Sequence, residues 1–230
     1  MDFNIRNYAV LDIFGIELWI TESLRNTWII MAALILFAII VRIALIRFKA
    51  VPKGFQNVVE ALVETFDNFV EGAAGEKFLF LGNWFFMAFA FIFISNISGM
   101  FFLRPPTADW TVTFALAVAT FILIHGVALK LRGRRYIKSL FEPNPVFFIL
   151  NVIGEVARPI ALSFRLFGNV LAGTILLTLM YTTAPVFLRF GIPAALHVFF
   201  DLFMGALQTY IFCILSISFI SIAATETEEA

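Results

Sequence analysis

Long apolar runs alternate with short polar segments along most of the chain. Five runs are long enough to cross a bilayer, which takes roughly 20 consecutive apolar residues in a helix. They cover about 27–46, 81–103, 110–129, 146–187 and 192–224. This pattern predicts an all-α membrane protein with about five transmembrane helices.

The segment 54–71 has a different pattern, with apolar and acidic residues on opposite sides of a helix. Its apolar stripe consists of Phe55, Val58, Val59, Leu62, Val63, Phe66, Phe69 and Val70. Its acidic stripe consists of Glu60, Glu64, Asp67 and Glu71. We therefore expect an amphipathic helix at the membrane interface. Helices that bind lipid surfaces are usually basic, so this acidic helix should contact protein or solvent, either as a plain connector or at a partner.

Two of the apolar runs are too long for upright helices. At 1.5 Å per residue, 146–187 would measure roughly 60 Å and 192–224 roughly 50 Å, against about 30 Å of hydrocarbon. Each could be one steeply tilted helix, so that the two form an antiparallel hairpin. Alternatively, 146–187 could be two ordinary spans with a turn near Arg165. The segment 164–169 has no proline and only one glycine and one asparagine as turn residues, which favours the tilted helix.

Basic residues mark the cytoplasmic side of membrane spans. Those that follow the first and third spans are Arg47, Lys49, Lys53, Lys130, Arg132, Arg134, Arg135 and Lys138. They predict a cytoplasmic loop at 130–145 and an external N-terminal segment at 1–26. The acidic tail 225–230 lies in the cytoplasm if 146–187 is one tilted helix, which gives five spans, and outside if it is two spans, which gives six.

Composition agrees with a membrane location and narrows the chemistry. Hydrophobic residues make up 61% of the chain and charged residues 14%, whereas soluble domains have about half and about a quarter. The net charge is zero, so no basic field points to nucleic acid. The single cysteine, Cys213, cannot form an internal disulfide. The sequence has no cluster of metal ligands, no phosphate-binding glycine loop and no nucleophile–base pair, so it supports no metal, no cofactor and no catalytic site of its own.

One arginine interrupts the fourth run, within SFRLFGNVLAG (Ser163–Gly173). An arginine at the bilayer centre costs at least roughly 2.5–3.5 kcal/mol, and intramembrane charges are functional by default. Because Arg165 stays protonated, its role would be electrostatic: it can hold an anion or repel a cation on an ion path. The alternative is an arginine at a loop or one that reaches the interface. Asn169 shares its helix face, and small residues leave a side-chain-poor surface nearby: Gly168, Ala172 and Gly173. The alternative is plain helix packing, which is the favoured interpretation for Gly173 taken singly.

The last run carries His197, Asp201 and Gln208. Their spacing of four and seven residues puts them on one face of an α-helix. An imidazole and a buried carboxylate can exchange protons near neutral pH, although a single histidine is more often a packing residue. The group is a candidate part of an ion path.

Two other carboxylates have two interpretations each. Glu155 lies ten residues before Arg165; it either pairs locally with Arg158 or accepts protons in a polar path beside Asn151. Asp109, in the loop after the second span, either lies at the mouth of such a path or caps the following helix.

Three motifs together resemble subunit a of the membrane sector of bacterial F-type ATP synthases. They are RLFGN followed by AG (Arg165–Asn169 and Ala172–Gly173), PTAD (Pro106–Asp109) with Thr113, and ALQTYIF (Ala206–Phe212). Their order, spacing and surrounding hydropathy agree with that family over nearly the whole chain. The resemblance favours the tilted hairpin, because the family wraps two such helices along a rotating ring of small subunits.

The resemblance implies a stator that is not catalytic by itself. Two half-channels would pass protons to and from the carboxylates of the c-ring, and Arg165 would separate them, so that ion flow drives ATP synthesis. Asn169 and Gln208 fall on matching positions. Asp201 aligns with a polar channel position, and Glu155 lies in the region of the other half-channel. A threonine, Thr174, stands where relatives often have an acidic residue or a histidine, so Asp201 would act where some relatives use a pair.

The implied partners are the c-ring subunits, the b-subunit peripheral stalk, the rest of the complex and membrane lipid, with no nucleic acid. The implied location is the plasma membrane of a bacterium, with the N-terminus outside and the C-terminus in the cytoplasm. Two alternatives stay open: the same role with Na⁺ as coupling ion, and a self-contained secondary transporter. The chain lacks the internal repeats common in transporters.

Overall fold

The computed structural model describes residues 7–13, 16–46, 54–101, 103–142, 144–185 and 191–225. A β-hairpin of β1 (Asn7–Ile13) and β2 (Ile16–Thr21) leads into α1 (Glu22–Ala44), α2 (Phe55–Ala74), η1 (Glu76–Leu81), α3 (Gly82–Ile97) and η2 (Ser98–Phe101). There follow η3 (Pro106–Ala108), α4 (Trp110–Arg132), α5 (Arg134–Ser139), η4 (Pro145–Phe147), α6 (Phe148–Thr183), α7 (Ile192–His197), η6 (Val198–Met204) and α8 (Gly205–Thr225).

The prediction of about five membrane-spanning helices is confirmed. Five helical stretches are long and apolar enough to cross a membrane: α1, Glu76–Phe101, α4, α6 and Ile192–Thr225. Many of their large apolar side chains are exposed, including Leu36 and Ile40 of α1. Such surfaces are costly in water and favourable in lipid. The chain is therefore a multi-pass membrane protein.

Helix α6 runs unbroken through Arg165. Its 36 residues extend roughly 54 Å at the usual rise. Neither Gly168 nor Asn169 ends the helix, so the alternative of two spans with a turn near Arg165 is wrong.

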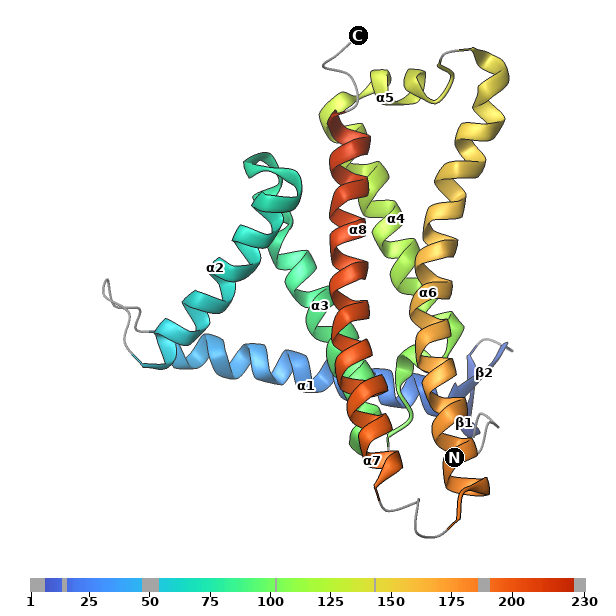
Figure 1. Cartoon of the computed structure of the whole chain (residues 1–230). Helices are drawn as coiled ribbons and strands as arrows, with labels where there is room; N and C mark the ends of the chain where they lie inside the picture. The colour runs from blue at the N-terminus through green and yellow to red at the C-terminus, as the bar shows by residue number, and fades with distance from the viewer. Residues whose placement is uncertain are drawn as a thin grey trace.

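Figure 1 shows α6 and α8 running antiparallel, close together near α7 and further apart toward α5. α4 contacts both of them extensively, and α3 packs against α8. α1 runs across the direction of α6 and α8 rather than along it (Figure 1). The 36 residues of α6 extend further than the roughly 30 Å of hydrocarbon, so α6 fits inside the bilayer only when it is steeply tilted.

The core lies where α3, α4, α6 and α8 meet. Its large buried side chains include Phe85, Ile92, Leu166, Phe212 and Ile217. Gly173 of α6 faces Phe200 of η6, whose Cβ would lie 3.1 Å from a Cβ added at the glycine. Gly173 is thus a packing residue between these elements, and it does not belong to the surface beside Arg165.

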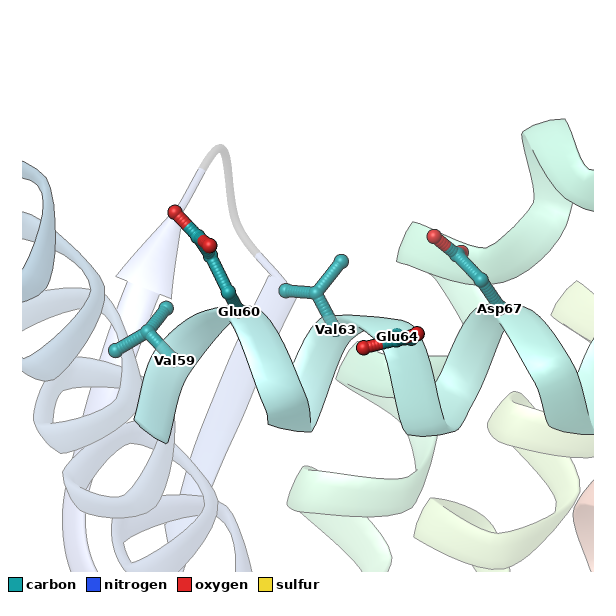
Figure 2. Close-up of a pocket in the computed structure, with 5 residues that line it drawn as sticks. All are labelled: Val59, Glu60, Val63, Glu64 and Asp67. Atoms are coloured by element: carbon teal, nitrogen blue, oxygen red, sulfur yellow. The ribbon is translucent and has the colours of Figure 1, made fainter. Parts of the chain in front are cut away.

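Helix α2 is the amphipathic helix predicted from the sequence. On its apolar side, the ring of Phe66 packs edge-on against Phe86 and Phe89 of α3, with centroids 5.0 and 5.2 Å apart. Where the two stripes meet is a shallow groove of about 340 Å³ (Figure 2), lined by Val59, Glu60, Val63, Glu64 and Asp67. The helix packs on α3 through Phe66, while Phe55, Val58, Leu62 and Val63 of its apolar stripe are exposed.

The hydropathy pattern does not predict two features of the fold. Within 1–26, backbone pairing from Asn7↔Thr21 to Ile13↔Ile16 forms the β-hairpin. In the last span, η6 is π-helical, a feature that often marks functional sites. Several other expectations lie outside the described residues: those for Arg47, Lys49, Lys53 and the tail from 226 onward.

Candidate functional site

Polar side chains gather at two places among the apolar helices. The α7-end cluster consists of Asn96, Gly99, Thr107, His197, Asp201, Gly205 and Thr209. The α5-end cluster consists of His125, Tyr136, Glu155 and Arg158. α7 and α5 lie at opposite ends of the α6–α8 hairpin (Figure 1), and Arg165 lies between them at the middle of α6.

The side chain of Arg165 is exposed, and within the described ranges it has no hydrogen bond or ion pair. Its neighbours Leu162 and Leu166 face the core. A groove of about 220 Å³ lies beside it, lined by Gly154, Ala157, Arg158, Ala161, Leu162, Arg165, Leu215 and Phe219. The described part of the chain thus presents a permanent positive charge without supplying an anion for it.

The face of α6 around Arg165 carries almost no side chains. Its exposed small residues are Gly154, Ala157, Ala161, Gly168 and Ala172. Spacings of three and four residues keep them on one side of the helix. Asn169 is half-buried beside this face. A surface of this kind lets another helix approach closely, so a partner helix can bring an anionic side chain to the guanidinium.

Asp201 and His197 form a tight pair. Nδ1 of His197 lies 2.6 Å from Oδ2 of Asp201, and their side chains are only 11% and 13% exposed. The carboxylate packs against Gly99 of η2, where an added Cβ would lie 2.8 Å from Oδ2. A glycine at that position is what allows the carboxylate to sit between η2 and η6.

A buried hydrogen-bond network supports this pair from α3. Nδ2 of Asn96 donates to the carbonyl of Gly205 at 3.2 Å, and the hydroxyl of Thr107 donates to Oδ1 of Asn96 at 2.8 Å. The hydroxyl of Thr209 donates to the same Gly205 carbonyl at 2.7 Å. Asn96 therefore links α3, the loop before α4 and the end of η6. The sequence analysis missed this residue, although an asparagine between serines in an apolar run, SNIS, was a visible signal.

The expected common face of the last span is only partly realised. The expectation assumed a uniform α-helix, but η6 is wider per turn, which shifts the register between Asp201 and Gln208. His197 and Asp201 are joined, and Gln208 is 6% exposed. No hydrogen bond connects Gln208 to the pair among the described residues.

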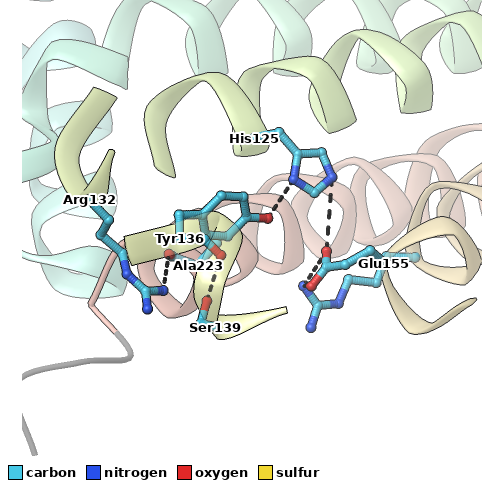
Figure 3. A network of polar contacts seen from close by, with 7 residues as sticks. His125, Arg132, Tyr136, Ser139, Glu155 and Ala223 are labelled. Carbon is cyan, nitrogen blue, oxygen red and sulfur yellow. Dashed lines mark hydrogen bonds and ion pairs between the residues drawn. The ribbon is translucent and has the colours of Figure 1, made fainter. Parts of the chain in front are cut away.

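In the α5-end cluster, Glu155 has contacts that fit both interpretations, the local pair with Arg158 and a place in a polar path. Nη1 of Arg158 lies 2.8 Å from both of its carboxylate oxygens, which is the local pair. The same carboxylate also faces His125 of α4, with Nε2 4.0 Å from Oε2 (Figure 3). Asn151 is not beside it in a hydrogen-bond network; its amide donates to the carbonyls of Leu140 and Glu142.

Asp109 is the N-cap of α4. Its Oδ1 accepts a hydrogen bond from the backbone N–H of Thr111 at 3.0 Å, which satisfies one of the free donors at the helix start. It follows η3 directly, two residues after Thr107 of the α7-end cluster. In the part of the chain that the structure describes, no three His, Cys, Asp or Glu side chains gather as metal ligands.

The two clusters and Arg165 together contain the groups that a path for protons needs. A histidine and a carboxylate occur in each cluster, and both groups can carry protons. Between the clusters lies the guanidinium of Arg165, which has no ion pair among the described residues, on a helix face of small side chains. The arrangement can therefore bring protons from two sides toward one positively charged barrier.

Known proteins share most of this sequence. A family model described as ATP synthase A chain matches residues 26–221. The chain is similar to ATP synthase subunit a of Moorella thermoacetica, with 34% identity covering 88% of this chain and 90% of the relative. It is also similar to a protein of Propionigenium modestum named ATP synthase subunit a, sodium ion specific, with 35% identity covering 87% and 73%. A third similar protein, ATP synthase subunit a of Geobacter sulfurreducens, has 32% identity covering 86% of this chain and 86% of the relative.

We predict that Asn96→Ala lowers the free energy of unfolding by about 1–3 kcal/mol, because it leaves buried partners without a hydrogen bond. Thermal unfolding in detergent micelles measures the change. Thr178→Val is the matched control, since its hydroxyl bonds only the carbonyl of Thr174 in its own helix. Equal unfolding midpoints for the two variants would contradict the supporting role of Asn96.

Proposed function

This chain belongs to the ATP synthase subunit a family, and on that premise we propose how its residues couple ion flow to rotation. It is the stator ion-channel subunit of the membrane sector and works within the ATP synthase complex. The residue roles, the coupling ion, the individual partners and the orientation proposed below are ours.

Arg165 is the fixed charge that faces the rotating c-ring. The observation that carries this role is an exposed guanidinium at the middle of α6, without an anionic partner among the described residues and on a face of small residues. A ring carboxylate that arrives there is stabilised in its ionised form, so it releases its ion. A neutral, reloaded carboxylate can turn into lipid at modest cost, whereas an ionised one cannot.

The two clusters serve as parts of the two half-channels. On the external side, Asp201 and His197 load the ring, with Gln208 and Asp109 along the same path. On the cytoplasmic side, Glu155 receives the ion, and Asn169 lies beside Arg165 between the two paths. Since Arg165 repels cations, an ion can pass from one side to the other only by riding the ring. Each elementary charge that crosses contributes roughly 2.3 kcal/mol per 100 mV, which drives rotation.

Protons are the proposed coupling ion. The support is the pairing of an imidazole with a carboxylate at 2.6 Å in the α7-end cluster, because such a pair passes protons. The specific observation that favours Na⁺ instead is the relative from Propionigenium modestum, whose name says that it is sodium ion specific.

The proposed partners are the c-ring, along the α6 face, and the b-subunit stalk, in the plasma membrane of a bacterium. The exposed basic residues of the loop at 130–145 support a cytoplasmic position for α5; they are Lys130, Arg134, Arg135 and Lys138. The segment 1–26 is then external, and the C-terminal end of α8 is cytoplasmic.

We expect Arg165→Ala to abolish ion-coupled ATP synthesis while the complex still assembles. Arg165→Lys should not restore it, because an ammonium lacks the planar two-pronged donor geometry. ATP synthesis by energised membrane vesicles is the measurement, with the amount of assembled complex as the reference. Ala161→Ser, on the same face, is the matched control and should keep most activity. Full coupled synthesis by Arg165→Ala would refute the role.

Asp201→Asn should reduce ATP-driven proton pumping to roughly a tenth, less than the 10²–10⁴-fold loss expected for a sole proton-transfer group. The loss is partial because His197 and other polar groups remain in the path. Quenching of a pH-sensitive dye in vesicles measures the rate. A wild-type rate of proton uptake by Asp201→Asn vesicles would show that Asp201 is not part of the path.

The coupling ion is tested by ATP synthesis in vesicles with and without Na⁺. If protons couple synthesis, a protonophore stops it and added Na⁺ has no effect. Synthesis that requires Na⁺ and survives the protonophore would replace protons by Na⁺ without changing the role of the subunit.

A further inference from the structure

The α5-end cluster contains a histidine that the roles above do not use. His125 comes from α4, Tyr136 from α5 and Glu155 from α6, so three separate elements converge at this point (Figure 3). Nδ1 of His125 lies 2.6 Å from the hydroxyl oxygen of Tyr136. Nε2, on the other side of the ring, faces Glu155 at 4.0 Å. The imidazole thus joins a carboxylate in the membrane to a side chain of the surface helix α5.

The ring is held in this orientation and one of its nitrogens is left without a hydrogen bond. Phe121 packs against it edge-on, with ring centroids 4.0 Å apart. Nε2 is buried and has no hydrogen-bond partner among the described residues. Its distance from Glu155 is too long for a direct hydrogen bond, but a gap of this size can be closed by one water or by a rotation of the Glu155 side chain.

The charges around the imidazole suit a transfer of protons. Arg158 contacts both carboxylate oxygens of Glu155 at 2.8 Å, so it stabilises the carboxylate that remains after a proton leaves. Arg158 also lines the groove that contains Arg165, which connects this pair to the barrier. Arg132 lies over the Tyr136 ring, 5.7 Å from its centroid. The charged groups that act on His125 are therefore Glu155 and Arg158 from α6, with Arg132 on the far side of the Tyr136 ring.

We propose that His125 is a proton-relay residue of the half-channel on the α5 side, and that Tyr136 passes the proton on. This inference rests on the function proposed above. The Oε–H bond of protonated Glu155 breaks and an Nε2–H bond of His125 forms. Nδ1 then releases its proton to the hydroxyl oxygen of Tyr136, which loses its own hydroxyl proton to water. One proton enters and one leaves, which leaves the Nε2–H tautomer; water that takes the Nε2 proton and returns one to Nδ1 restores the starting tautomer with no net change in protons.

The test uses vesicles that carry the complete membrane sector, with the cytoplasmic face outward and the catalytic head removed. Passive proton flux is measured while only the outer pH is varied. In His125→Gln, flux should fall at least about tenfold and lose its response to outer pH between about 5 and 8, where imidazole titrates. Tyr136→Phe, which removes a single oxygen atom, should also lower the flux about tenfold. Ser139→Ala is the matched control, because that hydroxyl donates only to the Tyr136 carbonyl.

Flux is expressed per assembled complex, so that poor assembly of His125→Gln does not mimic a loss; if it fails to assemble, Tyr136→Phe carries the test. Combining Glu155→Gln with His125→Gln should lower flux no further than the stronger single change, because groups in series act as a unit. Wild-type flux and pH response in His125→Gln or Tyr136→Phe, with Arg165→Ala inactive, would overturn the relay alone. Coupled pumping by Arg165→Ala would overturn the proposed function itself.

Discussion

A guanidinium that cannot lose its proton needs an anion in apolar surroundings, and the described part of this chain offers Arg165 none. The other arginines near the hairpin are satisfied at least in part: Arg158 holds Glu155, and Arg132 donates to the carbonyl of Ala223. Leaving one charge open at the middle of α6 costs at least roughly 2.5–3.5 kcal/mol in lipid. A ring carboxylate that comes and goes offsets that cost intermittently, and the small residues around Arg165 leave it room to approach.

The rest of the fold arranges polar groups on either side of that charge. The continuous helix α6 carries Arg165 together with Glu155 and Arg158 of the α5-end cluster, and its other half packs through Gly173 against Phe200 of η6, the element that holds Asp201. α4 lies between α6 and α8 on the α5 side (Figure 1). Asp201 is kept in place from three directions: by His197, by close contact with Gly99 and by the Asn96 network that joins α3 to the end of η6. At the other end, Glu155 lies between an arginine and an imidazole. Each cluster therefore has a carboxylate held by a basic side chain one turn away and packed against a residue of another element, Gly99 for Asp201 and His125 for Glu155.

Hydropathy and helix length were enough to predict the five spans and the amphipathic helix, because each depends on local pattern alone. The lack of turn residues around Arg165 favoured an unbroken helix but left two spans open as an alternative. The β-hairpin within 1–26 was not predicted, because long apolar runs identify membrane spans, whereas strands show an alternation of side chains every two residues. The π-helical turn at Asp201 and the contacts of Asn96 and His125 depend on how distant helices pack, and one sequence does not contain that information. Gly173 packs on Phe200, which agrees with the helix packing favoured for it, but the identity of its partner depends on the same tertiary contacts.

The most direct test is a density map of the assembled complex in lipid. The account predicts the Arg165 guanidinium at mid-membrane, on the α6 face toward the c-ring and within ion-pair distance of a ring carboxylate in at least one rotational state. A guanidinium in bulk water, or one that faces away from the ring in every state, would contradict it.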